Sequence, residues 1–272
     1  MRLTLLPALF LALAFFLVPV SIMLYQGLFD PGFTLEHFER FFTRGAYLRI
    51  FLNSIQISAI VGLICVLIGY PTAYFIVRQP RHRRPLLLFL VLVPMWMSVL
   101  VRTYAWMVLL GREGMINLAL IHLGLIDEPV KLMYTSGAVY IAMVQILLPI
   151  AIVTCYGTMA DIDQSLLSAA RIMGASPVQA FRRVFLPLSL EGAVTGFLIV
   201  FILSMGFFIV PALVGGPKDM MIANVIATQM AKANWGFAAS VALLLLIFTA
   251  LAMAGIRLAS RKLLYSARED LS

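Results

Sequence analysis

The chain has 272 residues, of which 62% are apolar and 12% are charged. A soluble domain carries about 25% charged and about 45–50% apolar residues, so this composition excludes an ordinary soluble fold. The formal net charge is +8, but the twenty Lys and Arg residues are dispersed along the chain, which argues against a nucleic-acid-binding face.

Six apolar segments are long enough to cross a hydrocarbon core of about 30 Å as helices. We therefore predict an all-α polytopic membrane protein with six transmembrane helices in a single domain over residues 1–272. The first segment is too long for a signal peptide and lacks a small-residue cleavage pattern, so it counts as a helix. The expected spans are 3–27, 50–77, 86–110, 135–156, 192–214 and 237–256.

Shorter elements are expected between the spans. The amphipathic stretch 35–42 is predicted to lie in the membrane interface. Pro94 interrupts the third span. Short helices are expected over 115–125 and 220–230, between consecutive spans.

Small residues within the spans suggest how the helices pack. Gly192 and Gly196 have the spacing that lets a neighbouring helix approach closely, although glycine is also frequent in such spans for no packing reason. Cys65 and Cys155 lie inside apolar spans without a partner at metal-ligand spacing, so we expect neither a zinc site nor a disulfide. Both cysteines are interpreted as small apolar fillers.

The distribution of positive charge predicts the orientation. The segment RQPRHRRP, residues 78–85, has four arginines and no acid, which is typical of a cytoplasmic loop. With alternating sides, twelve Lys and Arg residues fall on the side of this segment and eight on the other. We therefore expect a multi-pass protein with both termini in the cytoplasm and a cytoplasmic loop over 163–187.

This loop carries helix-boundary signals. Asp163 can cap a helix over 164–173, and Gly174 is a suitable left-handed stop after it. Ser176, Pro177 and Gln179 then form the pattern of a capping box with proline in the first helical turn. The loop is predicted to be a helix-turn-helix lying along the membrane surface.

Two interpretations of this helix-turn-helix stay open on physical grounds. Small side chains at Ala169 and Ala170 would let another protein sit against the first helix, and the three arginines would favour an acidic partner surface; these are Arg171, Arg182 and Arg183. The alternative is a solvated connecting loop. DNA reading is excluded, because Pro187 leads directly into a span and leaves no soluble domain to dock on a duplex.

The pattern SAA-x3-G-x9-V-x-LP resembles the EAA loop of permease subunits of type I ABC importers, at Ser168, Ala169, Ala170, Gly174, Val184, Leu186 and Pro187. Ser168 stands where that motif usually has Glu, and Val184 where it more often has Ile. Three further blocks resemble the B-type permeases of spermidine/putrescine importers: residues 69–94, 101–110 and 215–229.

The resemblance implies a type I ABC importer permease fold in the bacterial inner membrane. It also implies an assembly of two permease subunits, as a heterodimer, with two ATPase subunits and a periplasmic solute-binding protein. The loop residues expected to couple to the ATPase are Ser168, Ala169, Ala170, Arg171, Gly174, Arg182, Arg183 and Pro187. ATP and Mg would be bound by the ATPase, because this chain has no GxxxxGK[ST] motif and is expected to hold no cofactor or metal. The solute would cross by alternating access, and a polyamine such as spermidine or putrescine is favoured over an opine or a phosphonate.

A polyamine would meet no carboxylate at the membrane centre, because all twelve acids lie in loops, tails or span ends. Aromatic faces and polar side chains are therefore the candidates for the substrate pathway. The aromatic ones are Trp96, Tyr104 and Trp106, and the polar ones are Asn53, Gln56 and Gln145. The aromatic residues could instead form an interfacial belt, and the polar ones could bridge helices. Arg102, near the outer end of a span, is a further pathway candidate, but it could instead snorkel to the surface or meet an acid of the binding protein.

Two other classes of protein fit less well. An intramembrane enzyme would need a nucleophile, metal ligands or paired carboxylates inside the spans, whereas His37, His82 and His122 are scattered in loops or at span ends. A secondary transporter would be expected to show inverted repeats and buried ionisable coupling residues, and neither is apparent here. We therefore expect a non-enzymatic permease.

Overall fold

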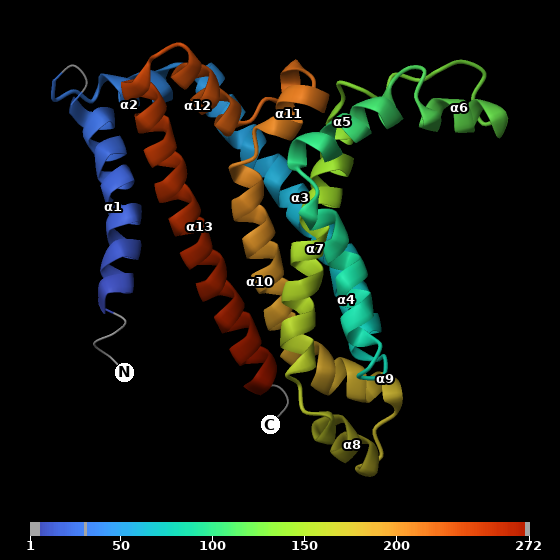
Figure 1. The fold of residues 1–272 in the computed structure, drawn as a ribbon. Helices are drawn as coiled ribbons and strands as arrows, with labels where there is room; N and C mark the ends of the chain where they lie inside the picture. Colours follow the sequence, from blue (N-terminus) through green and yellow to red (C-terminus); the bar gives the residue numbers. More distant parts are fainter. Residues whose placement is uncertain (1–5, 30–31, 270–272) are drawn as a thin grey trace.

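The computed structural model describes the backbone of residues 6–29 and 32–269, which form helices, turns and loops without a β-strand. The long helices run roughly side by side, and shorter helices lie across both ends of the bundle (Figure 1). In chain order they are α1 Leu6–Phe29, α2 Glu36–Thr43, α3 Gly45–Val77, α4 Arg84–Leu92, η2 Val93–Trp96, α5 Val99–Leu110, α6 Met115–His122, α7 Ser136–Ala160, α8 Gln164–Ile172, α9 Pro177–Ala180, η3 Phe181–Phe185, α10 Leu186–Met205, α11 Ile209–Val214, η4 Pro217–Asp219, α12 Ile222–Ala231 and α13 Trp235–Glu269.

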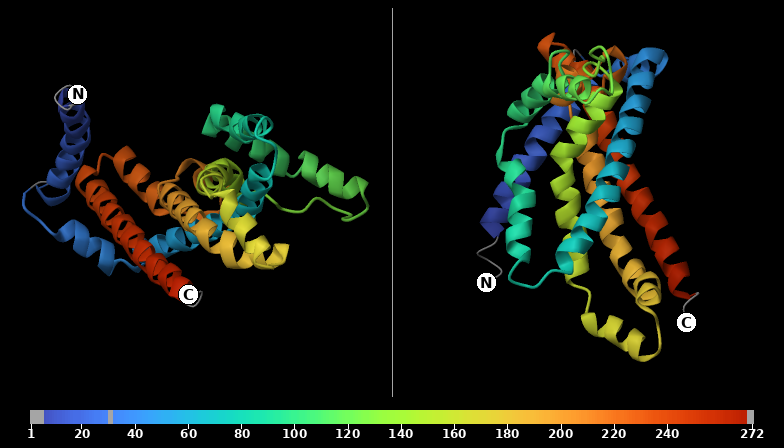
Figure 2. Two further views of the ribbon diagram at one scale, coloured as in Figure 1. Left: turned by 90° about the horizontal axis from the view of Figure 1, so that it is seen from below. Right: turned by 90° about the vertical axis from the view of Figure 1, so that its right-hand side faces the viewer.

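The two ends of the bundle are named here after α8 and α12. The α8 end carries α8, α9 and the loop between α3 and α4, whereas the α12 end carries α2, α6, α11 and α12 (Figure 1). The helix α1 starts and α13 finishes at the α8 end, in agreement between the views of Figures 1 and 2. The chain therefore enters and leaves the bundle on the same side.

Four helical stretches are long and apolar enough to cross a membrane, and the pair α4–η2 and α5–α6 counts as a fifth if it is one broken span. The helix α1 has 24 residues, which is about 36 Å of helix at about 1.5 Å per residue. With α1 the count fits the predicted six. The expected interfacial helix over 35–42 corresponds to α2, and the expected helix over 220–230 corresponds to α12.

The centre of the bundle is formed by α3, α7 and α10, which pack against one another. Val61, Val139 and Val200 are completely buried at this contact. A Cβ on Gly192 would lie 2.7 Å from the Thr158 Cβ, so α10 approaches α7 at a distance that only glycine allows. The prediction that this glycine permits close packing is confirmed. Cys65 and Cys155 are free and buried, as small fillers between these helices.

The helices α1 and α13 pack on each other at the edge of the bundle. The Ser240 hydroxyl of α13 donates to the Gly27 carbonyl of α1 at 2.9 Å. The helix α1 also exposes large apolar side chains, among them Phe10 and Phe15. Such a surface is what a hydrocarbon environment requires.

Several spans differ from their expected bounds by a few residues, and the third and fifth differ in course as well. The third is bent by 87° between Arg84–Trp96 and Val99–His122, because Pro94 ends the regular helix and Met97 and Ser98 adopt extended conformations. The fifth, expected over 192–214, begins earlier at Leu186 and ends at Met205, where Gly206 separates it from α11. The expected span 237–256 lies within the longer α13.

Candidate functional site

The α8–α9 segment at the α8 end is built by its own capping residues. The Asp163 carboxylate accepts a hydrogen bond from the Ser165 backbone N–H at 2.8 Å, as the N-cap of α8. This N–H, with a further hydrogen bond from the Ser165 side chain, lowers the pKa of Asp163. The predicted start of the helix is confirmed.

Gly174 ends α8 in the left-handed conformation, with φ +88°. Its N–H donates to the Arg171 carbonyl, and the Ala175 N–H donates to the Ala170 carbonyl, both at 3.0 Å. These two bonds form a Schellman motif. A Cβ on Gly174 would meet nothing within 4 Å in this chain, so the space beside it is open.

The capping box predicted at Ser176 is also confirmed. The Ser176 hydroxyl accepts from the Gln179 N–H, and the Gln179 side chain accepts from the Ser176 N–H at 2.9 Å. Pro177 occupies the first turn, where its missing N–H costs no hydrogen bond. Local sequence chemistry therefore determines the reversal from α8 to α9.

The second helix of the segment runs on into the membrane span, whereas we expected a separate surface helix. Residues Pro177–Met205 form one continuous helical stretch. Phe181–Phe185 adopt π-helical geometry directly before Pro187, with the Leu186 N–H bonded to the Phe181 carbonyl. Proline lacks an N–H and its ring displaces the carbonyl four residues earlier, and the wider π turn accommodates both effects.

The segment exposes apolar side chains that its own chain leaves uncovered. Ile172 and Met173 are each 87% exposed, and Val178 is also exposed. A groove of about 570 Å³ lies between α8 and the second helix, lined by Ala170, Met173, Gly174, Ala175, Gln179, Ala180, Arg183 and Val184. Exposed apolar residues rimmed by polar ones typically mark a protein-binding surface. Ile172 was not among the predicted coupling residues, although Ile172 and Met173 are two adjacent apolar residues directly before the helix stop at Gly174.

The predicted coupling residues divide between two surfaces. Ser168 and Ala169 are exposed on α8, whereas Ala170 and Pro187 are half-buried. The three arginines do not form one patch: Arg183 lines the groove with Gly174, while Arg171 lines a different pocket toward α3. Arg182 is exposed and lines neither.

At the α12 end, polar side chains hold the loop before α12 in place. The Asn53 amide donates to the carbonyls of Lys218 and Met220 at 2.9 and 3.1 Å. The Ser54 hydroxyl accepts from the Ile222 N–H at 2.7 Å. Asn53 thus bridges structural elements, which was the alternative to a pathway role.

Asp219 is buried, although it was expected among the acids of loops, tails and span ends. It is 4% exposed and accepts hydrogen bonds from the Ser136 hydroxyl and from the Gly216 N–H. Asn224 completes the arrangement by donating to the Phe208 carbonyl at 2.8 Å. In the sequence, the signal of this turn is the pair Gly215 and Gly216, with Asp219 three residues after the second glycine. We call Ser54, Ser136, Asp219 and Asn224 the α12-end network.

Two pathway candidates are brought together by the bend of the third span. The Trp106 indole N–H donates to the Gln145 side-chain oxygen at 3.5 Å. Both line a cavity of about 580 Å³, together with Pro94, Tyr140 and Pro149, and none of its lining side chains is charged.

The other candidates lie apart from this cavity. Trp96 is 72% exposed and packs its ring edge against Phe89, with centroids 5.4 Å apart. Tyr104 and Gln56 are exposed as well.

Arg102 is buried within the chain, contrary to the expectation that it would snorkel or reach a docked protein. It is 8% exposed, and its Nε and Nη1 atoms have no hydrogen-bond partner among the described residues. The bend turns α5 so that its Arg102 and Thr103 face is buried, and α5 packs against α11 and α7.

Comparisons with known proteins agree with this architecture. The chain is 39% identical over 216 residues to the spermidine/putrescine transport system permease protein PotB of Escherichia coli K12, covering 79% of this chain and 78% of that protein. The Haemophilus influenzae PotB is 37% identical over 238 residues, covering 87% and 78%. A crystal structure of a bacterial ABC transporter that imports the acidic polysaccharide alginate contains a chain with the same fold, with a TM-score of 0.73 over 96% of this chain and 94% of that one, at 18% identity.

The family model of the binding-protein-dependent transport system inner membrane component matches residues 44–265. This range contains the α8–α9 segment, the central helices and the α12-end network. The chain therefore belongs to the family of inner membrane components of binding-protein-dependent transport systems.

Proposed function

We propose that this chain is the permease subunit of an ATP-driven polyamine importer and that its α8–α9 segment binds the ATPase. The observation that carries the proposal is the exposed apolar face of Ile172 and Met173 beside the open space at Gly174. A segment capped so tightly by its own residues is rigid enough to transmit a force once a partner covers that face.

The proposed assembly has a second permease subunit, two ATPase subunits that bind ATP and Mg, and a periplasmic binding protein. The arginine-rich loop at the α8 end favours a cytoplasmic location for that end and for both termini. Closure of the ATPase dimer would displace the α8–α9 segments, and the bundles would rock between inward-open and outward-open states. ATP chemistry is assigned to the ATPase subunits, so this chain acts without a catalytic site.

Spermidine or putrescine is the proposed solute because the two relatives described above are named as permeases for these compounds. The uncharged cavity beside Trp106, Tyr140 and Gln145 supports the assignment. Aromatic faces and an amide oxygen can accommodate ammonium groups without a fixed carboxylate. The alginate transporter has the same fold, so the fold alone does not select the solute.

The test uses two glycines in equivalent geometry. Gly174 and Gly124 both end a helix with positive φ, +88° and +66°, and both have the two Schellman hydrogen bonds and open space around the Cβ position. Leucine at either position therefore imposes the same backbone cost, about 1–2 kcal/mol. Only Gly174 lies in the proposed ATPase-binding segment.

The expected result is that Gly174→Leu abolishes ATP-driven spermidine uptake in proteoliposomes and lowers recovery of the ATPase with the purified permease. Gly124→Leu is expected to retain ATPase recovery, and both variants are expected to insert normally. Full uptake and full ATPase recovery in Gly174→Leu would contradict the coupling role. If the parent transporter took up a different solute in an ATP-driven manner but took up neither spermidine nor putrescine, the substrate assignment would be wrong while the coupling role would stand.

A further inference from the structure

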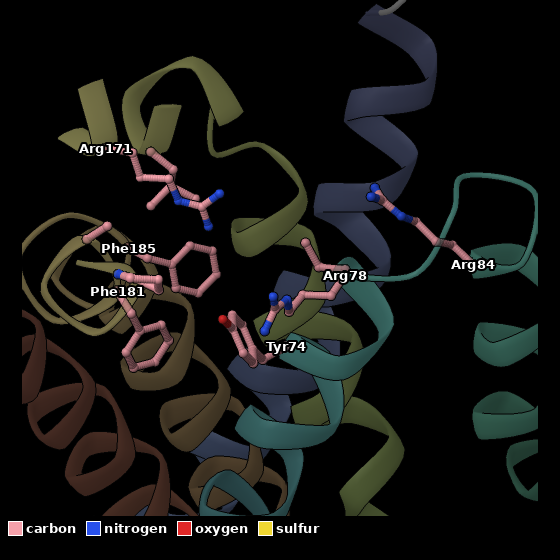
Figure 3. A pocket seen from close by; sticks show the side chains of 10 residues that line it. Tyr74, Arg78, Arg84, Arg171, Phe181 and Phe185 are labelled. Carbon is pink, nitrogen blue, oxygen red and sulfur yellow. The ribbon is translucent and has the colours of Figure 1, made fainter. Parts of the chain in front are cut away.

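A second pocket at the α8 end lies between the bundle and the α8–α9 segment. It has a volume of about 300 Å³ and is lined by the last turn of α3, the first residue of α4, and residues of α8, α9 and η3. Figure 3 shows Arg171 from α8 and Arg78 from the end of α3 beside the rings of Phe185 and Tyr74, with Arg84 apart from them on the other side of the pocket. The pocket thus joins the membrane part of the chain to the segment proposed to bind the ATPase.

The lining contains three guanidinium groups and no acid. Arg84 donates from Nε to the Gln79 carbonyl at 2.9 Å, and the Arg78 guanidinium lies 5.5 Å from the centre of the Tyr74 ring. Within the described part of the chain, Arg78, Arg84 and Arg171 form no ion pair with a carboxylate. Three like charges around one pocket repel one another, so an anion there would be bound favourably.

The chemistry of the pocket fits a ligand that has both a phosphate group and an apolar part. The planar guanidinium fork pairs two N–H groups with two phosphate oxygens, and three arginines can satisfy one phosphate group. The remaining side chains of the lining are apolar or aromatic, including Phe181 and Phe185. A small inorganic anion would leave that apolar surface uncovered, whereas a phosphoglycerol group with its attached chains would cover it.

The position of the pocket also favours a lipid. Tyr74 and Arg78 belong to the final turn and C-cap of a helix long enough to span the membrane, and Arg84 begins the next one. Basic pockets between transmembrane helices at this depth are typical binding sites for anionic head groups. We propose that Arg78, Arg84 and Arg171 bind the phosphate of an anionic phospholipid and that the bound lipid holds α8 against α3 and α4.

The first experiment measures lipid binding to the full chain. Native mass spectrometry compares phosphatidylglycerol with phosphatidylcholine of the same acyl chains, for the parent protein and for Arg78→Gln and Arg171→Gln. Each of these variants removes a charge-assisted contact, so we expect each to weaken phosphatidylglycerol binding about tenfold. Arg171→Lys keeps the charge but loses the fork, and an intermediate affinity is expected.

The matched control is Arg81→Gln. Arg81 is exposed in the same loop as Arg78 and Arg84 but does not line the pocket. The Arg81→Gln variant loses the same charge from the same end of the protein as Arg78→Gln does. Its affinity for phosphatidylglycerol is nevertheless expected to stay within about twofold of the parent value. An equal loss in Arg81→Gln would show that overall charge, and not this pocket, attracts the lipid, and would overturn the proposal.

The second experiment separates a lipid from a free phosphate and from a protein carboxylate. Hydrogen exchange of residues 164–172 is followed in nanodiscs of phosphatidylcholine, with added phosphatidylglycerol or with inorganic phosphate. We expect slower exchange with phosphatidylglycerol in the parent protein and no change in Arg171→Gln.

Equal protection by inorganic phosphate would overturn the lipid assignment. Unaltered lipid binding in Arg171→Gln, together with loss of the ATPase from the assembled transporter, would identify a carboxylate of the ATPase as the occupant and would also overturn it. A failure of either kind leaves the Gly174 result unaffected, because that experiment depends on a different surface.

Discussion

At the α12 end, buried polar side chains bond to backbone groups elsewhere in the same chain, such as Ser54 to Ile222 and Asn224 to Phe208. At the α8 end, the capping bonds of Asp163 and Ser176 reach only two or three residues along the chain. The turn before α12 buries Met221 and Ile222, whereas the end of α8 exposes Ile172 and Met173.

This difference separates two ways of making a rigid surface. Long-range bonds fix the α12 end with respect to the central helices, so the shape of that end is determined by this chain. Short-range bonds give the α8–α9 segment a defined shape while leaving its contacts available to another molecule. Substitutions at the α12 end should therefore change the stability of the subunit, and substitutions at the α8 end should change what it binds.

The largest effect is expected at Gly215, where a Cβ would lie 2.6 Å from the Pro211 carbonyl oxygen and 3.0 Å from Val139. Gly215→Ala should lower the free energy of unfolding by about 3 kcal/mol, because neither backbone nor buried helix can move aside easily. Thermal unfolding of the purified subunit in detergent measures this loss of stability. Gly157→Ala is the control, since nothing lies within 4 Å of its Cβ position and alanine favours the helix.

A smaller effect is expected from Asp219→Asn in the α12-end network. The Ser136 hydroxyl and the Gly216 N–H both donate to the carboxylate in the parent protein. An amide oxygen can still accept from the Gly216 N–H, and the Ser136 hydroxyl can turn to accept from the new N–H₂, so both hydrogen bonds become neutral ones. Because charge-assisted hydrogen bonds are about twice as strong as neutral ones, the change should cost about 1–2 kcal/mol in the same unfolding measurement. Glu191→Gln, at an exposed acid near the start of α10, should leave the transition unchanged. Equal stability of Asp219→Asn and the parent would show that the α12 end does not depend on this carboxylate.

The smallest effect concerns Asp163 at the α8 end. Its pKa lies below the usual 3.8 because the carboxylate accepts from the Ser165 N–H. A lowered pKa contributes stability that is present above the unfolded pKa and is lost as the pH falls through the folded one. Hydrogen exchange of α8, corrected for intrinsic rates, should therefore accelerate below about pH 4.

Asp163→Asn keeps a capping oxygen without a titrating group, so its α8 exchange should not change over the same pH range. A similar acceleration in this variant would mean that another group titrates. The global unfolding transition should move little in either protein, because the cap acts within a few residues.

The features that could be predicted from the sequence are those whose cause is local. The caps of α8 and α9 follow from Asp163, Gly174 and Ser176, whose side chains or φ values act on adjacent backbone groups. Apolar length alone indicated where the helices cross the membrane, and the Gly192 contact followed from residue size.

What could not be predicted depends on distant partners. Pro94 indicated an interruption but not a bend of 87°, which is set by how α5 packs on α11 and α7. The same packing buries Arg102, which the sequence did not indicate. Asp219 was counted among loop acids because its burial depends on Ser136, 83 residues away along the chain. The separation of Arg171 from Arg183 likewise results from the direction in which α8 returns toward α3.

The continuous helical stretch Pro177–Met205 has a mechanical consequence. No flexible loop stands between the bend at Gly174–Ser176 and the membrane interior, so a protein that displaces α9 also displaces α10. Within the membrane α10 packs against α7 at Gly192, where the two helices are too close to shift toward each other. The π turn at Phe181–Phe185 lies between α9 and the membrane part of α10, so a displacement of α9 reaches the membrane interior only through this turn.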